Sequence, residues 1–156
     1  MNLYFLRHGE AEPTSAGTSD DARRLTERGK RETAAVAQAA RSAGLRPGAI
    51  LTSPFRRARE TGEVLQEVFG VVAHADERLG SGCHLGAIQD LVAARAQDRI
   101  LFVGHEPDFS AIVGQLIGPA RVRMRTSGLA YVQTERVAPG QGILVWLLTP
   151  DFFASE

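Results

Sequence analysis

Four side chains that could do chemistry each follow a short apolar segment of this sequence; they are Arg7, His8, Arg57 and His105. A neutral imidazole nitrogen is a competent nucleophile near pH 7. A guanidinium group is a rigid fork of donors that suits bidentate binding of phosphate or carboxylate. Histidines and arginines that meet in one place would therefore bind an anion such as a phosphoryl group, which one of the histidines could attack.

The segments that precede these residues have the pattern of strands. Three of them are apolar without polar alternation, over residues 3–6, 49–51 and 100–103. This pattern is typical of strands in a parallel sheet that are buried on both faces. A weaker strand is expected over residues 71–73. Residues 131–134 and 143–148 are expected to form a closing hairpin, because a turn-forming run over 138–142 separates them.

Helical patterns separate the expected strands. Thr26 is the expected N-cap of a first helix, and Gly44 is its expected stop. Ser53 and Pro54 are the expected N-cap and first residue of a second helix, which runs to about Phe69. Two further helices are expected over residues 85–96 and 109–117. Strands that alternate with helices predict an α/β three-layer sandwich, with a mostly parallel central sheet flanked by helices.

The bulk properties of the chain limit its class. It has no linker, internal repeat or low-complexity tract, so residues 1–156 are expected to form one domain. Lys plus Arg and Asp plus Glu number 18 each, and this balance gives no reason to expect a nucleic-acid partner. Cys83 is the only cysteine, which favours a reducing, cytoplasmic location. No segment approaches the roughly 20 apolar residues of a membrane span, so no membrane partner is expected.

The predicted sheet implies where the chemical groups lie. In an open α/β sheet, ligands bind beyond the carboxyl ends of the strands, where helix N-termini present free N–H groups. Three strand ends would bring polar residues to that edge: Arg7 and His8 after the first strand, residues 53–57 after the second, and His105 after the fourth. The resulting cleft would hold two imidazoles and at least two guanidinium groups, which favours a dianion.

Several neighbours of these residues are weaker candidates. Glu10 and Glu106 lie beside the two histidines and could orient them or assist a water molecule, although carboxylates also repel a dianion. Ser53 is a further possible site residue. His74 and His84 do not follow strand ends in the same way, so we expect His74 to cap or cover an edge strand and His84 to lie on an exposed turn, both outside the site.

Four segments, in chain order, resemble the signatures of a known superfamily. They are residues 6–10 with an Arg-His-Gly triplet, residues 25–29 with an L-T-x-x-G pattern, residues 53–61 with S-P-x-x-R-A-x-x-T, and residues 103–105 with a second histidine. Together they resemble the histidine phosphatase superfamily, which includes cofactor-dependent phosphoglycerate mutases. The similarity to the small phosphohistidine phosphatases of the SixA group runs over nearly the whole chain, and residues 125–130 resemble a strand entry of that group.

The resemblance implies that His8 is the nucleophile and that Arg7, Arg57 and His105 bind the phosphoryl group. Phosphoryl transfer needs an in-line nucleophile and compensation of charge on three equatorial oxygens, and such a set supplies both. The two arginines should also help keep His8 neutral. The implied enzyme is a phosphatase with a covalent phosphohistidine intermediate and with no metal or cofactor. Its implied substrate is phosphohistidine on a protein, such as a histidine phosphotransfer domain, or a small phosphorylated molecule.

The region after the third expected strand departs from many phosphoesterases of the superfamily, which place a glutamate there to protonate the departing alkoxide. Asp76 and Glu77 are present, but Arg78 fills the position before Leu79. We interpret both carboxylates as solvated turn residues, with Glu77 kept as a possible site residue. Without a strong acid, phosphohistidine is favoured over alkyl phosphates. Two alternatives stay open: a general small-molecule phosphomonoesterase or mutase-like enzyme with the same nucleophile, and a non-catalytic binder of phosphorylated ligands.

Overall fold

The computed structural model describes residues 1–153 and contains a six-stranded sheet. Its strands are β1 (Asn2–Arg7), β2 (Ala49–Thr52), β3 (Ala73–Ala75), β4 (Arg99–Gly104), β5 (Leu129–Thr134) and β6 (Gly142–Leu148). They lie in the order β3-β2-β4-β1-β5-β6. The first four run parallel, whereas β5 is antiparallel to β1 and β6 is antiparallel to β5. The sheet is therefore mostly parallel, as predicted, and the closing hairpin is confirmed.

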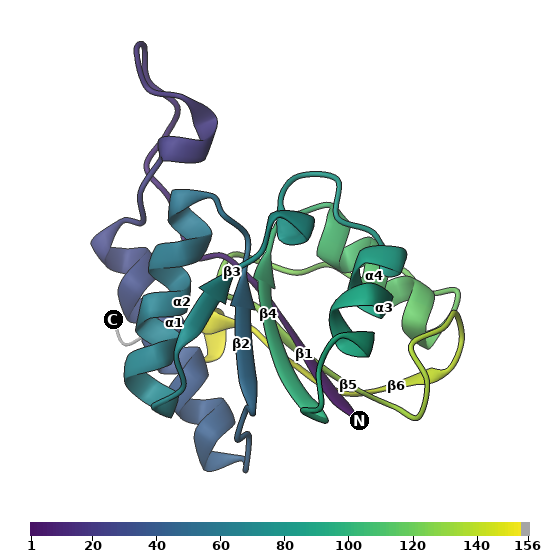
Figure 1. The fold of residues 1–156 in the computed structure, drawn as a ribbon. Coiled ribbons are helices and arrows are strands. Elements are labelled where there is room, and N and C mark those ends of the chain that lie inside the picture. The colour runs from purple at the N-terminus through teal and green to yellow at the C-terminus, as the bar shows by residue number, and fades with distance from the viewer. Residues whose placement is uncertain (154–156) are drawn as a thin grey trace.

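Helices cover both faces of this sheet (Figure 1). α1 (Glu27–Ser42) and α2 (Arg56–Phe69) lie on one face, and α3 (Leu85–Ala93) and α4 (Asp108–Ile117) lie on the other. Three short 3-10 turns complete the elements: η1 (Asp20–Ala22), η2 (Glu77–Leu79) and η3 (Pro150–Phe152). The expected three-layer α/β sandwich is confirmed. Among the residues described, no helix has the length and apolar character needed to cross a membrane.

The apolar run of β1 explains why this strand lies inside the sheet. Leu3 and Phe5 pack into the core beneath α3 and α4, whereas Tyr4 and Leu6 pack into the core beneath α1 and α2. Burial of each such side chain contributes about 1.5–3 kcal/mol. Because both faces are fully used, the strand cannot slip by one residue without exposing half of its side chains. The position of the residues that follow β1 is therefore well defined.

Most of the expected elements have the expected bounds within one or two residues. Thr26 caps α1 with its hydroxyl, and Gly44 follows that helix with φ +100°, both as predicted. Two bounds were wrong. The third strand is not 71–73 but two residues later, because those first residues serve to connect the end of α2 to the sheet edge. α3 ends three residues earlier than expected, since its apolar spacing stops at Val92.

The expected start of α2 was also wrong. Ser53 is not its N-cap and Pro54 is not its first residue, because the helix begins at Arg56 with Phe55 in the capping position. The Ser53 hydroxyl accepts a hydrogen bond from the Phe55 N–H at 3.2 Å and lies 2.7 Å from a ring nitrogen of His105. Ser53, whose type and position are typical of a helix N-cap, therefore contacts His105 at the end of the neighbouring strand β4.

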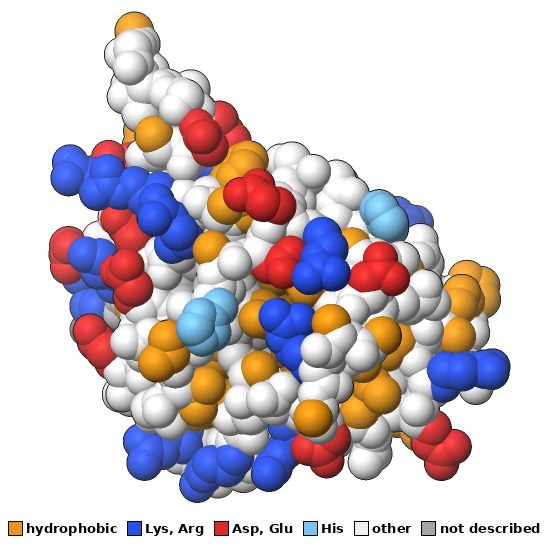
Figure 2. Space-filling view, in the orientation of Figure 1, with side chains coloured by type: hydrophobic (Ala, Val, Ile, Leu, Met, Phe, Trp, Pro, Cys, Tyr) orange, Lys and Arg blue, Asp and Glu red, His pale blue; other side chains and the backbone are white. Residues whose placement is uncertain are grey.

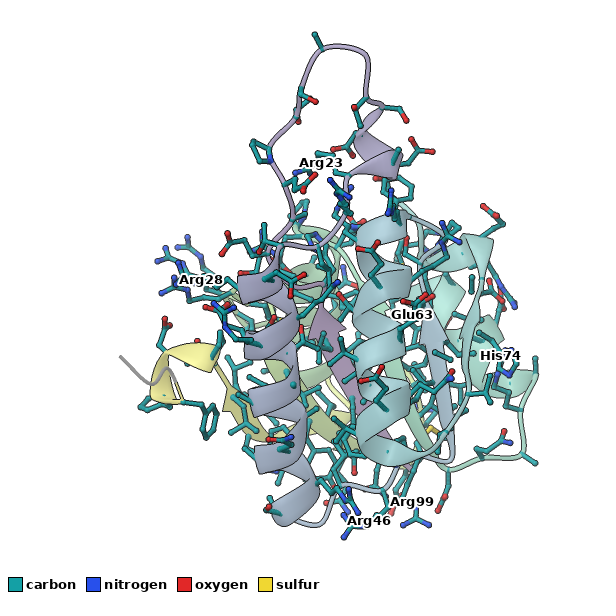
Figure 3. The ribbon with its side chains drawn as sticks, turned by 90° about the vertical axis from the view of Figure 1, so that its left-hand side faces the viewer. Arg23, Arg28, Arg46, Glu63, His74 and Arg99 are labelled. Carbon is teal, nitrogen blue, oxygen red and sulfur yellow. The ribbon has the colours of Figure 1, made fainter. Side chains whose placement is uncertain are left out.

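A long loop over residues 8–26 connects β1 to α1 and projects beyond the carboxyl ends of the strands (Figure 1). In Figure 2 its tip is almost free of charged side chains, whereas acidic and basic side chains surround its base. η1 lies on the return path of this loop, and Figure 3 places Arg23 at its base above the two helices. The loop therefore brings charged residues next to the strand ends.

Candidate active site

A pocket of about 430 Å³ opens at the carboxyl ends of the strands, beside the base of the projecting loop. All four residues selected from the sequence line it: Arg7, His8, Arg57 and His105. β1 and β4 are parallel neighbours in which Arg7 lies opposite Gly104, so His8 and His105 leave the sheet at the same level. Their ring centroids are 5.2 Å apart. The sheet thus brings together groups that are far apart in the chain.

His8 is the first residue after β1 and is only 8% exposed. Its Nδ1 lies 2.7 Å from the carbonyl oxygen of Gly9. Because a carbonyl oxygen can only accept a hydrogen bond, Nδ1 carries the proton of the neutral ring and Nε2 keeps its lone pair. The Arg57 Nε–H donates to this Nε2 at 3.2 Å. The pocket therefore contains an unprotonated imidazole nitrogen with a guanidinium group directly beside it.

The environment of His8 strongly disfavours its protonation. Its pKa is lowered from 6.5 to about 3, mainly because burial penalises the charged ring. The nearby His105, Arg57 and Arg7 lower the pKa further, whereas the hydrogen bond to the Gly9 carbonyl raises it. The sequence led us to expect that the arginines keep His8 neutral. They contribute, but burial, which only the folded chain decides, is the larger cause.

Two glycines allow the chain after His8 to pack against the first turn of α1. A Cβ atom at Gly9 would lie 2.9 Å from the Gly29 carbonyl oxygen and equally close to Thr33 Oγ1. A Cβ atom at Gly29 would collide with the backbone carbonyl of Glu10. These contacts are too short for any side chain, so the glycines of the first two sequence motifs meet each other in space. Their mutual packing fixes the backbone that carries the His8 ring.

Arg57 lies in the first turn of α2, and its side chain is 7% exposed. Besides the contact with His8, its Nη1 donates to the backbone carbonyl of Asp20 at 2.7 Å and its Nη2 pairs with the Asp20 carboxylate at 3.2 Å. Burial lowers the pKa of Arg57 and Asp20 raises it, but a guanidinium group stays charged near pH 7. One turn later, the Thr61 hydroxyl accepts from the Gly9 N–H and donates to the Arg57 carbonyl.

Arg7 ends β1 and has hydrogen-bonding capacity to spare. Its Nη1 donates to the backbone carbonyl of Met124 at 3.0 Å. Its Nε is buried and has no hydrogen-bond partner among the residues described. Burial lowers the pKa of Arg7, and the nearby Glu106 carboxylate partly offsets that effect. A buried donor without a partner is unfavourable unless a ligand accepts from it, so Arg7 is suited to hold an anion in the pocket.

His105 follows β4 and is 4% exposed. Its Nε2 lies 2.7 Å from Ser53 Oγ, whereas its Nδ1 is buried without a partner among the residues described. The Ser53 oxygen already accepts from the Phe55 N–H, and its own hydrogen is used only if it donates to Nε2. With the hydroxyl as donor to Nε2, the ring proton lies on Nδ1, where it can be donated to a bound anion. Burial, and then Arg57, lower the pKa of His105 to about 4.

The two glutamates beside the histidines both line the pocket, but each is engaged elsewhere. Glu10 Oε2 lies 3.5 Å from Nε of Arg28, whose position at the start of α1 is labelled in Figure 3. Glu106 accepts hydrogen bonds from both the N–H and the hydroxyl of Ser110, so it caps the first turn of α4. Both carboxylates act as hydrogen-bond or ion-pair acceptors in this structure.

The residues after β3 bring no carboxylate to the pocket. Asp76 caps η2 and pairs with Arg78, and this hydrogen bond lowers its pKa to about 2. Glu77 is exposed on η2 and does not line the pocket. Of this region, only Ser81 reaches the lining. His74 on the edge strand β3 is exposed, as Figure 3 shows, and neither it nor the exposed His84 lines the pocket.

Sequence reasoning missed five residues of the pocket lining: Ala11, Asp20, Arg23, Ser81 and Thr126. Asp20 and Arg23 belong to the projecting loop, and Asp20 contacts both Arg57 and Arg23. The only signal in the sequence was a cluster of charged residues within 20–24, which follows an uncharged run over residues 13–19. Thr126 lies within the stretch 125–130 that resembles the SixA group, where it had no assigned role.

Sequence comparisons agree with the motifs. The family model of the histidine phosphatase superfamily (branch 1) matches residues 3–82 of this chain. An uncharacterized protein of Picosynechococcus sp. is 30% identical over 158 residues, and the alignment covers 86% of this chain and 96% of that protein. The matched residues of the family model include Arg7, His8 and Arg57 but end before β4.

Solved structures are similar along almost the entire chain. The protein histidine phosphatase SixA in complex with tungstate is 25% identical with a TM-score of 0.87, and the match covers 99% of this chain and all of that chain. A candidate phosphohistidine phosphatase SixA of Agrobacterium tumefaciens is 28% identical with a TM-score of 0.82, covering 96% of this chain and 97% of that one. The order of strands and helices found here therefore has counterparts in solved structures.

Proposed function

The chain belongs to the histidine phosphatase superfamily, a class of phosphatases and mutases, and from this premise we propose that it is a phosphatase with His8 as nucleophile and phosphohistidine on a protein as substrate. One observation carries the proposal: a buried imidazole whose Nδ1 is tied to a carbonyl leaves the Nε2 lone pair in a pocket that also holds Arg7, Arg57 and His105. The reaction needs this combination of a neutral nucleophile and fixed donors.

In the first step, His8 Nε2 attacks phosphorus in line with the bond to the substrate imidazole. The new bond joins Nε2 to phosphorus, and the substrate nitrogen leaves with the electron pair of the broken bond. Arg7, Arg57 and the Nδ1–H of His105 donate hydrogen bonds to the three equatorial oxygens as charge builds on them. Arg57 already contacts Nε2, so little movement is needed for it to transfer this donor to a phosphoryl oxygen.

In the second step, water attacks the phosphorus of the phosphorylated His8. The bond between phosphorus and Nε2 breaks, its electron pair returns to the ring, and the water proton passes to the phosphate product or to solvent. The same donors stabilise the second transition state, because the phosphoryl oxygens stay in place while nucleophile and leaving group exchange positions. The Gly9 carbonyl supports both steps, since it holds the Nδ1 proton and so favours the neutral ring that is released.

The preference for phosphohistidine rests on the leaving group. An alkoxide needs a proton as it departs, which requires a general acid held in its protonated form. The carboxylates of the pocket accept hydrogen bonds or pair with arginines: Glu10, Glu106 and Asp20. Phosphohistidine has a second ring nitrogen that takes its proton from water, so its imidazole leaves as a neutral molecule without help from the pocket. The name of the similar SixA structure, a protein histidine phosphatase, supports the same choice.

A substrate panel tests this preference. We expect kcat/KM for a protein that carries phosphohistidine to exceed that for an alkyl phosphate such as glycerol phosphate by at least about 100-fold, a difference that one missing acid can produce. An aryl phosphate with a good leaving group serves as the matched control, since it needs no protonation but lacks the protein. Equal rates on the alkyl phosphate and the phosphohistidine protein would overturn the proposed substrate.

Trapping of the intermediate tests the nucleophile. Phosphohistidine is labile in acid, so the reaction with isotopically labelled substrate is quenched in alkali and the phosphorylated peptide is identified by mass spectrometry. The label is expected on His8. Label on an aspartate, serine or cysteine would contradict the proposed chemistry, and label on His105 would exchange the proposed roles of the two histidines.

A second candidate is a general phosphomonoesterase or mutase-like enzyme for small molecules that uses the same nucleophile. It is favoured by one observation, that Glu10 and Glu106 line the pocket and could protonate an alkoxide if a substrate displaced their present partners. The substrate panel distinguishes the two candidates. For the cellular location, Cys83 as the single cysteine supports the cytoplasm as our proposal.

A further inference from the structure

The contact between Asp20 and Arg57 has no part in the mechanism above, although it is the most extensive polar contact of that arginine. We propose that Asp20 is a positioning residue, through which the projecting loop holds the Arg57 guanidinium in the orientation that its phosphate-binding role requires. This inference rests on the proposed function of Arg57 and deepens it. It assigns to the loop over residues 8–26 a direct share in the reactivity of the pocket.

Every nitrogen of the Arg57 guanidinium has a partner, and Asp20 supplies two of the three. Nη1 donates to the Asp20 backbone carbonyl at 2.7 Å, Nη2 pairs with the Asp20 carboxylate at 3.2 Å, and Nε donates to His8 Nε2 at 3.2 Å. The guanidinium group is planar, so fixing its terminal nitrogens also fixes the direction of Nε. Asp20 therefore holds one edge of the group while the opposite edge faces the nucleophile.

A negative charge at this position needs an explanation, because it acts against the binding of a dianion. Coulomb repulsion between the Asp20 carboxylate and a phosphoryl group would weaken substrate binding. The carboxylate is ionised, since Arg57 and Arg23 lower its pKa despite an opposing contribution from desolvation. A contact that opposes binding through its charge is expected to contribute through its geometry. The two contributions have opposite signs, so an experiment can separate them.

Asp20 is itself held by the loop. Its second carboxylate oxygen accepts from Arg23 Nε at 3.0 Å, and Arg23 Nη1 donates to the backbone carbonyl of Glu12 at 2.9 Å. A chain of contacts thus leads from the outgoing part of the loop, at Glu12, through Arg23 and Asp20 to Arg57. Figure 3 shows Arg23 at the base of the loop, where it joins the body of the molecule. The conformation of the loop is therefore coupled to the orientation of Arg57.

The test compares Asp20→Ala with Asp21→Ala. Asp21 is an exposed carboxylate in the same 3-10 turn and makes no hydrogen bond or ion pair among the residues described, so the control removes the same charge without the contact. Binding of inorganic phosphate is measured by calorimetry, and turnover is measured with an aryl phosphate. For Asp20→Ala we expect phosphate binding to weaken and kcat/KM to fall by about 10-fold or more, which corresponds to the loss of one charge-assisted hydrogen bond. Asp21→Ala should stay within about twofold of the wild type.

A conservative variant adds the readout that a merely structural residue would not give. Asp20→Asn keeps an oxygen that can accept from Arg57 Nη2 but removes the charge, so it should restore most of the binding and turnover lost in Asp20→Ala. Tighter phosphate binding in Asp20→Ala than in the wild type would overturn the proposal, because it would show that the carboxylate acts only by repulsion. If Asp20→Ala fails to fold, Asp20→Ser takes its place, and phosphate binding in Asp20→Ser that is as tight as or tighter than in the wild type overturns the proposal.

A titration of the His8 ring by NMR gives an independent test that needs no turnover. Arg57 lowers the pKa of His8, so release of Arg57 in Asp20→Ala should raise that pKa above its value of about 3, whereas Asp21→Ala should leave it unchanged. An unchanged His8 titration in Asp20→Ala would show that Arg57 keeps its place without Asp20. Phosphate binding and the His8 titration test the role of Asp20 alone. The proposed function is tested separately, by the trapping and substrate experiments described above.

Discussion

The ends of β1 and β4 make the most informative comparison within this molecule. Each parallel strand delivers one histidine to the same pocket, and both rings are buried, with His8 8% and His105 4% exposed. Their hydrogen-bond partners differ: the Nδ1 of His8 meets a backbone carbonyl, which can only accept, and its Nε2 accepts from Arg57, whereas the Nε2 of His105 meets the Ser53 hydroxyl, which can donate or accept. The carbonyl therefore fixes the His8 proton on Nδ1, and a hydroxyl that donates to Nε2 allows the His105 proton to lie on Nδ1.

This difference gives the two histidines complementary roles in the proposed reaction. His8 offers a lone pair at Nε2, and His105 offers a donor at Nδ1 that has no partner among the described residues. Residue type, burial and position at a strand end are common to both and cannot separate a nucleophile from a donor. The local hydrogen bond can, because a neutral imidazole has one proton and two nitrogens.

Removal of His8, whose Nε2 lone pair lies at the end of β1, should have the largest effect on activity. His8→Ala is expected to lower kcat/KM by about 10⁴-fold or more, because the covalent route is lost. The fold should be retained, since the residue follows the strand rather than filling a core, and circular dichroism checks this. Glu77→Ala, at an exposed position outside the pocket, is the matched control. A His8→Ala protein with more than a few per cent of wild-type activity would contradict the role of His8 as the nucleophile.

Loss of the donor at the end of β4 should have a smaller effect. His105→Ala is expected to lower kcat/KM by about 10²-fold, which is typical for removal of one donor to a transition-state oxygen. The phosphorylated intermediate should still form on His8 and be detectable after an alkaline quench. If His105→Ala instead abolished the intermediate and His8→Ala did not, the roles of the two strand ends would be reversed.

The low pKa values of both rings predict how stability depends on pH. In the unfolded chain each histidine titrates near 6.5, whereas in the fold His8 titrates near 3 and His105 near 4. Between these values the unfolded state binds more protons, so stability should rise with pH from about 3 to 6.5 and then level off with respect to these groups. Urea unfolding of the wild type should show this loss on going from pH 7 to pH 5.

Substitution of His8 measures how much of this pH-dependent loss of stability comes from that one ring. His8→Ala should reduce the loss of unfolding free energy between pH 7 and pH 5 by up to about 2 kcal/mol, the most that a single neutral histidine can contribute over this range. A variant whose pH dependence equals that of the wild type would show that His8 takes up protons in the folded state as readily as in the unfolded one. Catalysis should not decline through His8 protonation above about pH 5.

The smallest expected effect concerns the partner that distinguishes the two rings. Ser53→Ala removes the hydroxyl that, by donating to Nε2, would keep the proton of His105 on Nδ1, and we expect kcat/KM to fall by about 10-fold, in line with the loss of one hydrogen bond of about 1–1.5 kcal/mol. Ser42→Ala, at the end of α1, is the control for a serine outside the pocket. An unaffected Ser53→Ala enzyme would mean that His105 needs no second partner to present its proton.

The sequence was sufficient for the features that depend on regular local patterns. The apolar runs determined the strands, the alternation with helices determined the sandwich, and the position of Arg7, His8 and His105 at strand ends led to one edge of the sheet. This worked because parallel strands place their carboxyl ends together whatever their separation in the chain. Arg7, His8, Arg57 and His105 could be selected as site residues because each lies at or after the end of a strand that reaches this edge of the sheet.

Other features were decided only by the tertiary structure. Ser53 has the sequence pattern of a helix cap, but its hydroxyl contacts a residue from a strand about 50 positions away. Asp20 belongs to a loop without periodic pattern, so nothing local fixes where its carboxylate lies. The depressed pKa of His8 comes mainly from burial, which is a property of everything packed around the ring. Strand patterns in the sequence determine which strand-end groups reach the pocket, whereas hydrogen-bond partners and burial, which depend on distant segments, determine the protonation of those groups.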